Sequence, residues 1–549
     1  MPAPALPAPA APASAAAGPD EMLAFLADRT LYAHAPACVD VVQTHISYVA
    51  LAPPLVFKVK KPLDLGFLDY STPERRRHFC EEEVRLNRRL CAGVYEAVVP
   101  ITRQGGRLAW GGAGPLVEVA VRMRHLDPAG FLDARLDAGT LATADLDCVA
   151  DVLAAFYHAQ RPTAEAAAWG RADRLRVSTD ENAAQTERFV GTLLSRPAHE
   201  ALRYATERFF SGRARLLSRR RAEGRVVDGH GDLRLEHVHL MPGHLAPEGD
   251  AGCVCVYDCV EFNERLRLVD VANDVAFLAM DLDAHGRPGL ARHVAERIAT
   301  ALGDPELLGV LDFYKGYRAT VRGKVEGMRS EEPEVPAAER AASVEHAQAF
   351  FRLALGYAVA GSQPLVVAVM GRAATGKSTL ARALADALGW EAVGSDAVRK
   401  AAAGVPLFVR GDAAARAALY APDRTDATYA ALTDAALGRA TRGLGTVLDA
   451  TFATRRHRDA LRAALAAAGV GHRFVELVAP DDVLRARLSA REGAPGEISD
   501  ARLADFEALA ARFEPPTPLE DPDHLTADAE DDAEACTADV LRHLVRLSG

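Results

Sequence analysis

The spacing of apolar residues changes along this chain after residue 358. Before that point, strand-like alternation covers 41–61 and 98–123, and an amphipathic helix is predicted over 73–91. Helical spacing then dominates from 141 to 222 and from 268 to 358. A β-rich part followed by a large helical part predicts an α+β domain.

The C-terminal third has a different pattern. Three continuous apolar runs, at 365–370, 445–450 and 474–479, are separated by helical segments. Continuous runs are typical of strands buried on both faces, so this alternation predicts an α/β domain with a parallel sheet between two layers of helices. The acidic, Pro-containing stretch 517–535 predicts a surface loop before a last helix at 534–547.

These patterns divide the chain into four predicted parts. The boundaries follow from the change of period, from the Gly-Ser-Gln-Pro turn signal at 361–364 and from the composition of the N-terminus. The parts are a disordered Ala/Pro-rich tail (1–20), an N-terminal domain (21–358), a linker (359–364) and a C-terminal domain (365–549).

Composition and charge narrow the class of protein. The chain has 549 residues, of which 49% are hydrophobic and 25% charged, and these values exclude a disordered, collagen-like or coiled-coil protein. The net charge of −11 argues against nucleic acid as a general partner. No apolar run reaches the roughly 18 residues of a membrane span, and the tail has no basic segment of a signal peptide. We therefore expect a cytoplasmic protein that does not bind membranes, with reduced cysteines.

A phosphate-binding loop follows the first C-terminal run. Residues 371–378 fit G-x4-G-K-S between a buried strand and a helix, the context in which this motif is specific. Backbone N–H groups of such a loop surround phosphate oxygens, the lysine neutralises them, and the serine hydroxyl reaches Mg²⁺. The predicted ATP-binding residues are Gly371, Arg372, Ala373, Ala374, Thr375, Gly376, Lys377, Ser378 and Thr379.

Charged residues that follow the phosphate-binding loop are candidates for catalysis and for binding phosphate or metal. Asp396 is suited to accept a proton from a hydroxyl, and Arg399 to bind an anion. Asp449 ends an apolar run, where a carboxylate would hold Mg²⁺. Arg487 and Arg491 share a helix face that could close over phosphate, with a solvated face paired to nearby acidic residues as the alternative.

The P-loop and the S-D-x-x-R segment at 395–399 resemble the small P-loop kinases, a group that includes polynucleotide kinase, zeta-toxin and gluconate-kinase-like enzymes. The resemblance covers about 362–520. It implies that Asp396 is the catalytic base and Arg399 a substrate clamp. It does not specify the phosphoryl acceptor, because the group acts on several classes of molecule.

A second set of phosphotransfer residues precedes the linker. The segment His230-Gly231-Asp232 and the later Asp258 follow the order of a base carboxylate and a metal carboxylate in kinases. Upstream, Lys58 lies on a predicted strand and Glu83 on the predicted helix, as expected for a Lys–Glu pair at ATP phosphates. Lys60 and Glu82 remain open as alternatives to these two.

These segments resemble the aminoglycoside phosphotransferase branch of the protein-kinase-like fold over about 30–355. The resemblance implies a two-lobed fold, with Asp232 as base, Asp258 as a Mg²⁺ ligand and Asp274 as a structural carboxylate. His237 stands where this branch has a metal-binding Asn, although Mg²⁺ prefers oxygen ligands. Ser47 is the candidate for the phosphate-loop role.

The whole arrangement resembles the bifunctional aminoglycoside phosphotransferase/ATP-binding protein family, mainly through the segments KKPLDLGFLDYST and HGDLRLEHV. The resemblance implies an ATP- and Mg²⁺-dependent transfer of a phosphoryl group to the hydroxyl of a small molecule, mainly by the P-loop domain. Two alternatives stay open: an N-terminal domain that senses a ligand without catalysis, and a kinase of the zeta-toxin or nucleic-acid-end type.

Overall fold

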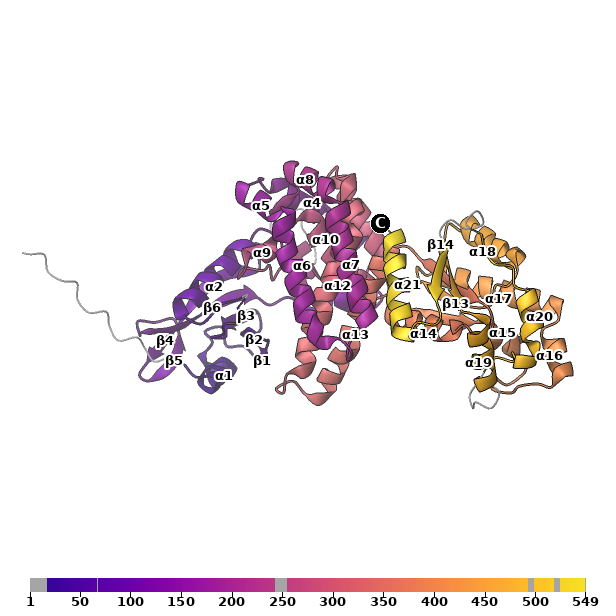
Figure 1. The fold of residues 1–549 in the computed structure, drawn as a ribbon. Helices are drawn as coiled ribbons and strands as arrows, with labels where there is room; N and C mark the ends of the chain where they lie inside the picture. The colour runs from indigo at the N-terminus through magenta and orange to yellow at the C-terminus, as the bar shows by residue number, and fades with distance from the viewer. Residues whose placement is uncertain (1–16, 67, 242–253, 492–497, 518–523, 549) are drawn as a thin grey trace, which may run out of the picture. The chain divides into compact units, whose positions relative to one another are not determined.

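The computed structural model describes residues 17–66, 68–241, 254–491, 498–517 and 524–548 (Figure 1). The chain divides into two compact units. The first unit consists of Met1–Gly170, Arg220–Asp281 and Arg292–Leu307, and the second of Arg171–Arg219, Leu282–Ala291 and Leu308–Gly549. Helical segments on both sides of the chain's middle therefore group with its C-terminal third. No helix among the described residues is long and apolar enough to cross a membrane.

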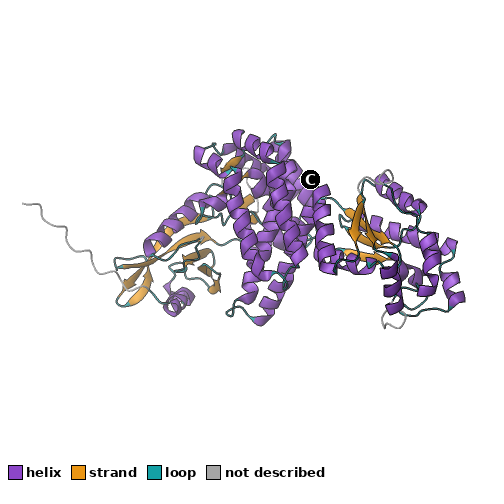
Figure 2. Ribbon diagram, in the orientation of Figure 1, coloured by secondary structure: helices purple, strands orange, loops and turns teal. Residues whose placement is uncertain are grey.

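The first unit contains a six-stranded antiparallel sheet in the order β1-β2-β3-β6-β4-β5 (Figure 2). The predicted β signal at 41–61 and 98–123 corresponds to these strands. Their bounds are β1 (Asp40–Gln43), β2 (Ser47–Ala52), β3 (Leu55–Lys60), β4 (Tyr95–Gln104), β5 (Arg107–Trp110) and β6 (Leu116–Arg124), and a first helix, α1 (Pro19–Ala27), precedes them.

Helix α2 (Pro73–Asn87) packs against this sheet. Thr72 caps its first turn by accepting a hydrogen bond from the backbone N–H of Arg75, and Pro73 occupies a position where no N–H is needed. Its buried positions recur at three- and four-residue intervals, at Arg76, Cys80, Glu83, Val84 and Asn87 among others. This period places Glu83 on the face that contacts the sheet.

Two short antiparallel pairs position the loops of the first unit. β7 (Val226–Asp228) pairs with β10 (Leu268–Asp270), and β8 (Val238–Leu240) pairs with β9 (Val254–Val256). The helices of this region are α3 (Leu132–Asp137), α4 (Thr143–Ala159), α5 (Ala164–Trp169), α9 (Glu264–Arg267), α10 (Val271–Ala284) and α11 (Pro288–Ala301).

Two cysteines of the first unit are paired. Cys91 and Cys255 form a disulfide with their Cα atoms 4.8 Å apart, across 164 residues of sequence. The expectation that all cysteines are reduced was therefore wrong, because folding brings together two residues whose spacing carries no signal. Cys259 is buried as well, and Cys253 lies outside the described residues.

Long helices form the first part of the second unit. They are α6 (Ala172–Thr186), α7 (Arg196–Gly212), α12 (Leu308–Glu331) and α13 (Ala337–Ala360). The shorter α8 (Ala214–Ala222) spans the boundary between the two units. α12 and α13 pack closely, and Gly323 makes room for this contact, since a Cβ atom there would lie 2.8 Å from the ring of Phe351.

The C-terminal third forms a five-stranded parallel sheet in the order β12-β13-β11-β14-β15. The predicted parallel sheet and the three predicted strands are thus confirmed. The bounds are β11 (Leu365–Gly371), β12 (Glu391–Gly394), β13 (Thr446–Asp449), β14 (Gly471–Val478) and β15 (Leu525–Asp528). Alternate residues of β11 belong to two different hydrophobic cores, one on each face of the sheet.

Helices cover both faces of this sheet. They are α14 (Lys377–Leu388), α15 (Ser395–Ala402), α16 (Ala413–Leu419), α17 (Pro422–Ala440), α18 (Arg455–Ala467), α19 (Asp481–Arg491), α20 (Phe506–Ala511) and α21 (Ala533–Leu547). The predicted last helix is confirmed as α21. The predicted surface loop over 517–535 was partly wrong, because edge strand β15 lies within it, with Leu525 and Ala527 buried and the alternate residues exposed.

Candidate functional site

The P-loop begins at the end of β11, where the backbone conformation and the available space both require glycine. Gly371 has φ +136°, and a Cβ atom there would lie 2.4 Å from the carbonyl oxygen of Leu477. Gly376, with φ +97°, directly precedes α14. The chain therefore curls around the helix N-terminus, where backbone N–H groups and the helix dipole favour an anion.

Lys377 is held inside this loop. Its Nζ donates to the main-chain carbonyl of Arg372 at 2.7 Å. Burial lowers the pKa of its ammonium group, although Asp449 and Asp396 act in the opposite direction. A lysine that donates to a carbonyl of its own loop can exchange that bond for one to a phosphate oxygen.

Asp449 lies at the carboxyl end of β13, in register with Val369 of β11 and Gly394 of β12. Burial raises the pKa of Asp449, whereas Lys377 and the nearby Ser378 hydroxyl act to lower it. A hydroxyl and a carboxylate side by side are oxygen ligands of the kind that Mg²⁺ prefers, so these residues fit a magnesium ion.

Asp396 opens α15 at the same edge of the sheet. The hydroxyl of Tyr420 donates to its Oδ1 at 3.0 Å. The guanidinium group of Arg399 lies 4.4 Å from the centre of the Tyr420 ring and donates to Thr425 Oγ1 at 3.0 Å. Burial, and then the charge of Asp396, raise the pKa of Tyr420, which keeps its hydroxyl protonated as a donor.

The three arginines of α19 differ in their contacts. Arg487 donates to the carbonyl of Ala529 at 2.6 Å, at the end of β15, and Arg485 pairs with Glu507. Arg491 is close enough to Lys377 to lower the pKa of that lysine. The structure therefore brings Arg491 towards the P-loop and holds Arg487 against the main chain elsewhere.

The first unit assembles its candidate residues from distant parts of the chain. Lys58 Nζ lies 2.9 Å from Glu83 Oε1 and 2.6 Å from Asp258 Oδ1. Burial alone would lower the pKa of Lys58, but Asp258 and Glu83 raise it well above its ordinary value. Burial would likewise raise the pKa of Asp258, but Lys58 and then His237 hold it below its ordinary value.

The neighbouring candidates Lys60 and Glu82 make different contacts from Lys58 and Glu83. Lys60 also pairs with Glu83, at 2.6 Å, but its other partners are Glu261 and Tyr70, and only 1% of its side chain is exposed. Lys58 alone reaches Asp258. Glu82 pairs instead with Arg85 on the exposed side of α2.

Asp232 lies in a loop that other carboxylates anchor. Asp274 accepts hydrogen bonds from the backbone N–H groups of His230 and Gly231, at 2.6 and 2.8 Å. Arg234 lies 3.1 Å from Asp232 Oδ2. The Nδ1 atom of His237 lies 2.7 Å from the Asp232 carbonyl oxygen, and its Nε2 atom lies 3.7 Å from Asp258 Oδ2.

The role of Ser47 at a nucleotide phosphate stays a prediction. Ser47 begins β2 opposite Lys60, it is fully buried, and its hydroxyl has no hydrogen-bond partner among the described residues. Within the described ranges, no group of three or more His, Cys, Asp or Glu side chains is arranged to hold a metal ion.

Sequence reasoning missed three residues that support these sites. Tyr420 holds Asp396, Asp281 accepts a bond from the backbone N–H of Leu235 next to the Asp232 loop, and Lys400 bonds three main-chain carbonyls. Lys400 had a signal, since it is one of only seven lysines in the chain. The other two residue types are common, and their partners are distant in sequence.

Some known proteins match only the C-terminal third of the chain, and others match most of it. The family model described as AAA domain matches residues 366–516. Among solved structures, a gluconokinase from Sinorhizobium meliloti 1021 is 23% identical and covers 34% of this chain and 94% of its own, with a TM-score of 0.26. A sugar kinase from Janibacter sp. HTCC2649 is 24% identical and covers 33% of this chain and 94% of its own, with a TM-score of 0.25.

Two curated relatives match most of the chain. They are the uncharacterized protein Rv2004c of Mycobacterium tuberculosis (strain ATCC 25618 / H37Rv) and the uncharacterized protein Mb2027c of Mycobacterium bovis (strain ATCC BAA-935 / AF2122/97). Each is 32% identical over 486 residues, which cover 86% of this chain and 90% of the relative. This chain therefore belongs to the same family as these mycobacterial proteins, and its residues 366–516 match the AAA domain model.

Proposed function

We propose that the C-terminal domain, residues 365–549, is a kinase that transfers the γ-phosphoryl group of ATP to a hydroxyl of a small molecule. One observation carries the proposal: the parallel strands end with Lys377, Asp449 and Asp396 at a single edge of the sheet, beside a glycine loop shaped for phosphate. A phosphate-binding lysine, a metal carboxylate and a possible base are the parts that phosphoryl transfer needs.

Each residue has a stated role in this proposal. The N–H groups of residues 371–378 and the ammonium group of Lys377 bind the ATP phosphates. Ser378 and Asp449 would hold Mg²⁺, which supplies positive charge to the phosphate oxygens when bound. Arg491 and Arg399 add positive charge around the transferred group. Catalysis is mainly positioning and electrostatic stabilisation.

Asp396 is the base in this scheme. Its carboxylate accepts the proton of the acceptor hydroxyl as the acceptor oxygen forms its bond to phosphorus and ADP leaves. The Tyr420 hydroxyl, which donates to Oδ1, fixes the rotamer of this carboxylate and leaves Oδ2 to receive the proton. Tyr420 is thus a positioning residue.

The test is ADP release from ATP and Mg²⁺ with a panel of aminoglycosides, sugars, nucleosides and 5′-hydroxyl oligonucleotides. We expect one class to stimulate release by the wild-type protein, and Lys377→Ala and Asp396→Asn to remove the stimulation. If stimulation survives in Lys377→Ala but is lost in Asp232→Ala, the first unit performs the chemistry and the proposal fails.

We propose, as a second site, a protein-kinase-like ATP site in residues 21–358. The ion pairs that join Lys58 to both Glu83 and Asp258 support it, because a lysine between these two carboxylates is the arrangement that binds ATP phosphates in kinases. The base would be Asp232. Asp258 and His237 would hold the metal, with the histidine favouring softer ions than Mg²⁺.

A non-catalytic sensor is the alternative for this second site, and the position of His237 beside Asp232 and Asp258 favours it. The substitution His237→Asn separates the two. A large gain of Mg²⁺-dependent turnover that Asp232→Ala abolishes indicates a catalytic site, whereas unchanged nucleotide binding without turnover indicates a sensor.

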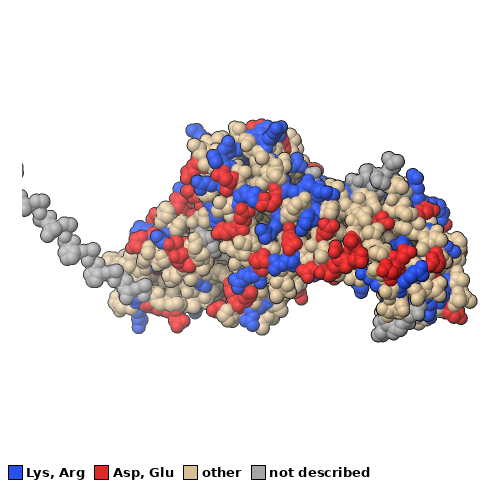
Figure 3. Space-filling view, viewed as in Figure 1, with Lys and Arg blue, Asp and Glu red and all other residues tan. Residues whose placement is uncertain are grey.

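An acceptor of the zeta-toxin or nucleic-acid-end type is a further alternative. Over the face in view in Figure 3, Lys and Arg side chains are interspersed with Asp and Glu, consistent with the net charge of −11. A nucleic-acid acceptor predicts affinity that falls steeply with salt. Affinity for the stimulating acceptor that is independent of salt would support a neutral small molecule.

A further inference from the structure

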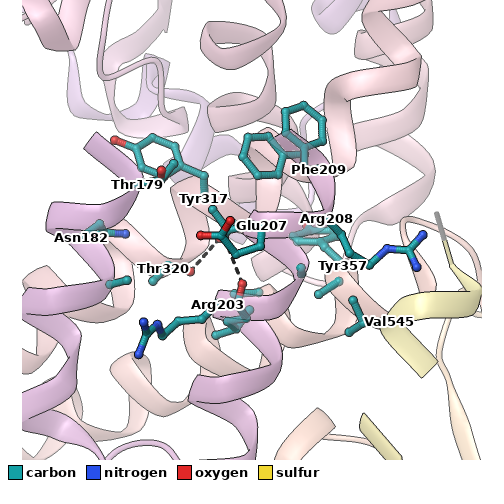
Figure 4. A pocket seen from close by; sticks show the side chains of 18 of the residues that line it. Thr179, Asn182, Arg203, Glu207, Arg208, Phe209, Tyr317, Thr320, Tyr357 and Val545 are labelled. Carbon is teal, nitrogen blue, oxygen red and sulfur yellow. Dashed lines mark hydrogen bonds between the residues drawn. The ribbon is translucent and has the colours of Figure 1, made fainter. Parts of the chain in front are cut away.

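A cavity of about 1090 Å³ lies among helices of the second unit (Figure 4). Its walls come from α6, α7, α12, α13 and the end of α21, which all belong to that unit. None of its lining residues is a candidate phosphotransfer residue. The volume is that of sites that enclose drug-sized molecules.

One wall of the cavity is aromatic. The rings of Phe209 on α7 and Phe313 on α12 are stacked, with their planes 2° apart and their centres separated by 3.5 Å. Tyr317 and Tyr357 also line the space, and Figure 4 shows Phe209 and Tyr317 along one side. Such a wall favours a flat or apolar body over a strongly hydrated one.

One glycine that lines the cavity, Gly316, is not required by the packing of its helix against α13. Gly316 lies in the interior of α12, where glycine costs about 0.5–1 kcal/mol relative to alanine. A Cβ atom at Gly316 would make only ordinary contacts, at 3.6 Å or more, unlike one at Gly323 of the same helix. The missing side chain at 316 keeps the cavity open.

Asn182 is a polar group without a partner in this wall. Only 4% of the residue is exposed, and its side-chain oxygen has no hydrogen-bond partner among the described residues. A buried acceptor without a donor costs about 1–3 kcal/mol. A ligand N–H or hydroxyl group would satisfy it.

The charged groups around the cavity differ in how they are paired, and the charge of Arg203 lowers the pKa of both Glu187 and Glu207. The carboxylates of the cavity have partners: Glu207 pairs with Arg176, Glu187 lies 2.5 Å from Arg196, and Asp312 accepts from the N–H of Ser362 at 3.1 Å. Across the described part of the chain, by contrast, three guanidinium groups that line the cavity make no hydrogen bond or ion pair. They are those of Arg203, Arg208 and Arg213.

We propose that this cavity binds an amphipathic organic anion. Its flat apolar body lies against Phe209 and Tyr317, an N–H or hydroxyl group faces Asn182, and a carboxylate, sulfonate or phosphate group meets Arg203 or Arg208. Guanidinium groups bind such anions in a bidentate manner.

The cavity shares a hydrophobic core with the P-loop. Val545 of α21 lines the cavity and belongs to the same core cluster as Val367 of β11 and Leu380 and Leu384 of α14, the helix that begins at Lys377. A ligand that moves α21 therefore acts on the helix that carries the phosphate-binding lysine. This coupling rests on the proposed function, whereas the binding site itself does not.

Binding is tested by calorimetry with the full chain and 8-anilinonaphthalene-1-sulfonate, an anion with a planar naphthalene ring and one N–H group. We expect one saturable site, a loss of affinity of at least ten-fold in Gly316→Leu and in Arg203→Gln/Arg208→Gln, and wild-type affinity in two controls. The controls are Gly356→Leu on α13 and Arg215→Gln on α8, neither of which lines the cavity. Unchanged melting temperatures show that the variants fold.

Competition identifies the anion. Displacement by 1-naphthyl phosphate or 1-naphthoate, but not by the neutral 1-naphthylmethanol, supports the proposal, and the stronger of the two anions shows whether phosphate or carboxylate is preferred. Equal displacement by the neutral compound, or wild-type affinity in Gly316→Leu, overturns it.

Coupling between the cavity and the P-loop is measured as the change in ATP affinity that a saturating concentration of the probe causes. We expect a change of at least five-fold in the wild-type protein and no such change in Lys377→Ala. Unchanged ATP affinity overturns the coupling while the binding result stands. If Lys377→Ala binds ATP like the wild-type protein, the proposed P-loop function fails instead, and the probe titration still decides the cavity.

Discussion

Lys377 and Lys58 lie beside carboxylates at the two candidate ATP sites, but their surroundings differ. Lys377 donates to a main-chain carbonyl, and burial lowers its pKa. Lys58 already has two carboxylate partners, Glu83 and Asp258, which raise its pKa. One site keeps a charge available for an anion, and the other uses its charges to hold three segments of the chain together.

Because of this difference, removing the lysine charge should affect mainly function at one site and mainly stability at the other. Removal of a charge that lacks an ionic partner costs little folding free energy but removes a binding group. Removal of a charge from a buried network leaves the remaining charges without compensation, which strongly destabilises a fold. The two sites should therefore respond in opposite ways to the same kind of substitution.

The largest effect is expected for Glu83→Gln. Glu83 is fully buried between Lys58 and Lys60, and its neutralisation leaves two buried ammonium groups with one carboxylate fewer. We expect a loss of about 3–5 kcal/mol from the unfolding free energy of the first unit, measured as the shift of its transition in urea. The matched control is Glu82→Gln on the exposed side of α2, for which we expect a change within about 0.5 kcal/mol. Equal shifts in the two variants would show that the network does not stabilise the fold.

Lys377→Ala should show the reverse behaviour. We expect acceptor-stimulated ADP release to fall by about 10²–10³-fold, because the variant lacks the charge that stabilises the phosphate oxygens. The urea transitions should stay close to those of the wild-type protein. Lys58→Ala is the informative comparison, since it leaves Glu83 and Asp258 without one partner and should lower stability. A destabilised Lys377→Ala would remove the contrast between the sites.

The two sites also differ in how far the sequence predicts them. The P-loop is contiguous: an apolar run, two glycines with required backbone angles and a lysine all lie within 365–378, so local pattern and local geometry agree. Helix α2 was predicted over 73–91 and spans Pro73–Asn87, and its period alone places Glu83 on the buried face.

No local sequence pattern indicates the contacts between segments that are distant in the chain. Lys58 and Asp258 are 200 residues apart, and only the fold shows which of the neighbouring lysines reaches the carboxylate. The Cys91–Cys255 pair and the contact of Tyr420 with Asp396 likewise depend on tertiary packing. No local pattern indicated that Ser47 is fully buried either.

A pH dependence of the first unit should follow from His230. Its Nε2 atom lies 2.8 Å from the carbonyl oxygen of Tyr257, and its Nδ1 atom accepts from the N–H of Asp232 at 3.3 Å. Burial lowers the pKa of His230 below its unfolded value of about 6.5, so the folded state binds fewer protons than the unfolded state. The resulting stability is present above pH 6.5 and is lost as the pH falls below it.

We expect the unfolding free energy of the first unit to fall by up to about 1.4 kcal/mol per pH unit below 6.5. Urea transitions between pH 7.5 and 5.5 measure this slope, and ATP binding by the P-loop reports the second unit in the same samples. His230→Asn, which can still donate and accept, should have a shallower slope. The same slope in both proteins would assign the dependence to another group.

The smallest effect is expected for Tyr420→Phe. The variant lacks the hydroxyl that donates to Asp396 Oδ1 at 3.0 Å but keeps the ring against Arg399. We expect kcat/KM for the acceptor to fall about five-fold, or ~1 kcal/mol, with unchanged affinity for ATP, because the carboxylate loses orientation while the phosphate site is intact. Tyr204→Phe on α7 is the matched control. A wild-type kcat/KM in Tyr420→Phe would show that Asp396 needs no orienting partner, and a weaker affinity for ATP would place Tyr420 in the nucleotide site instead.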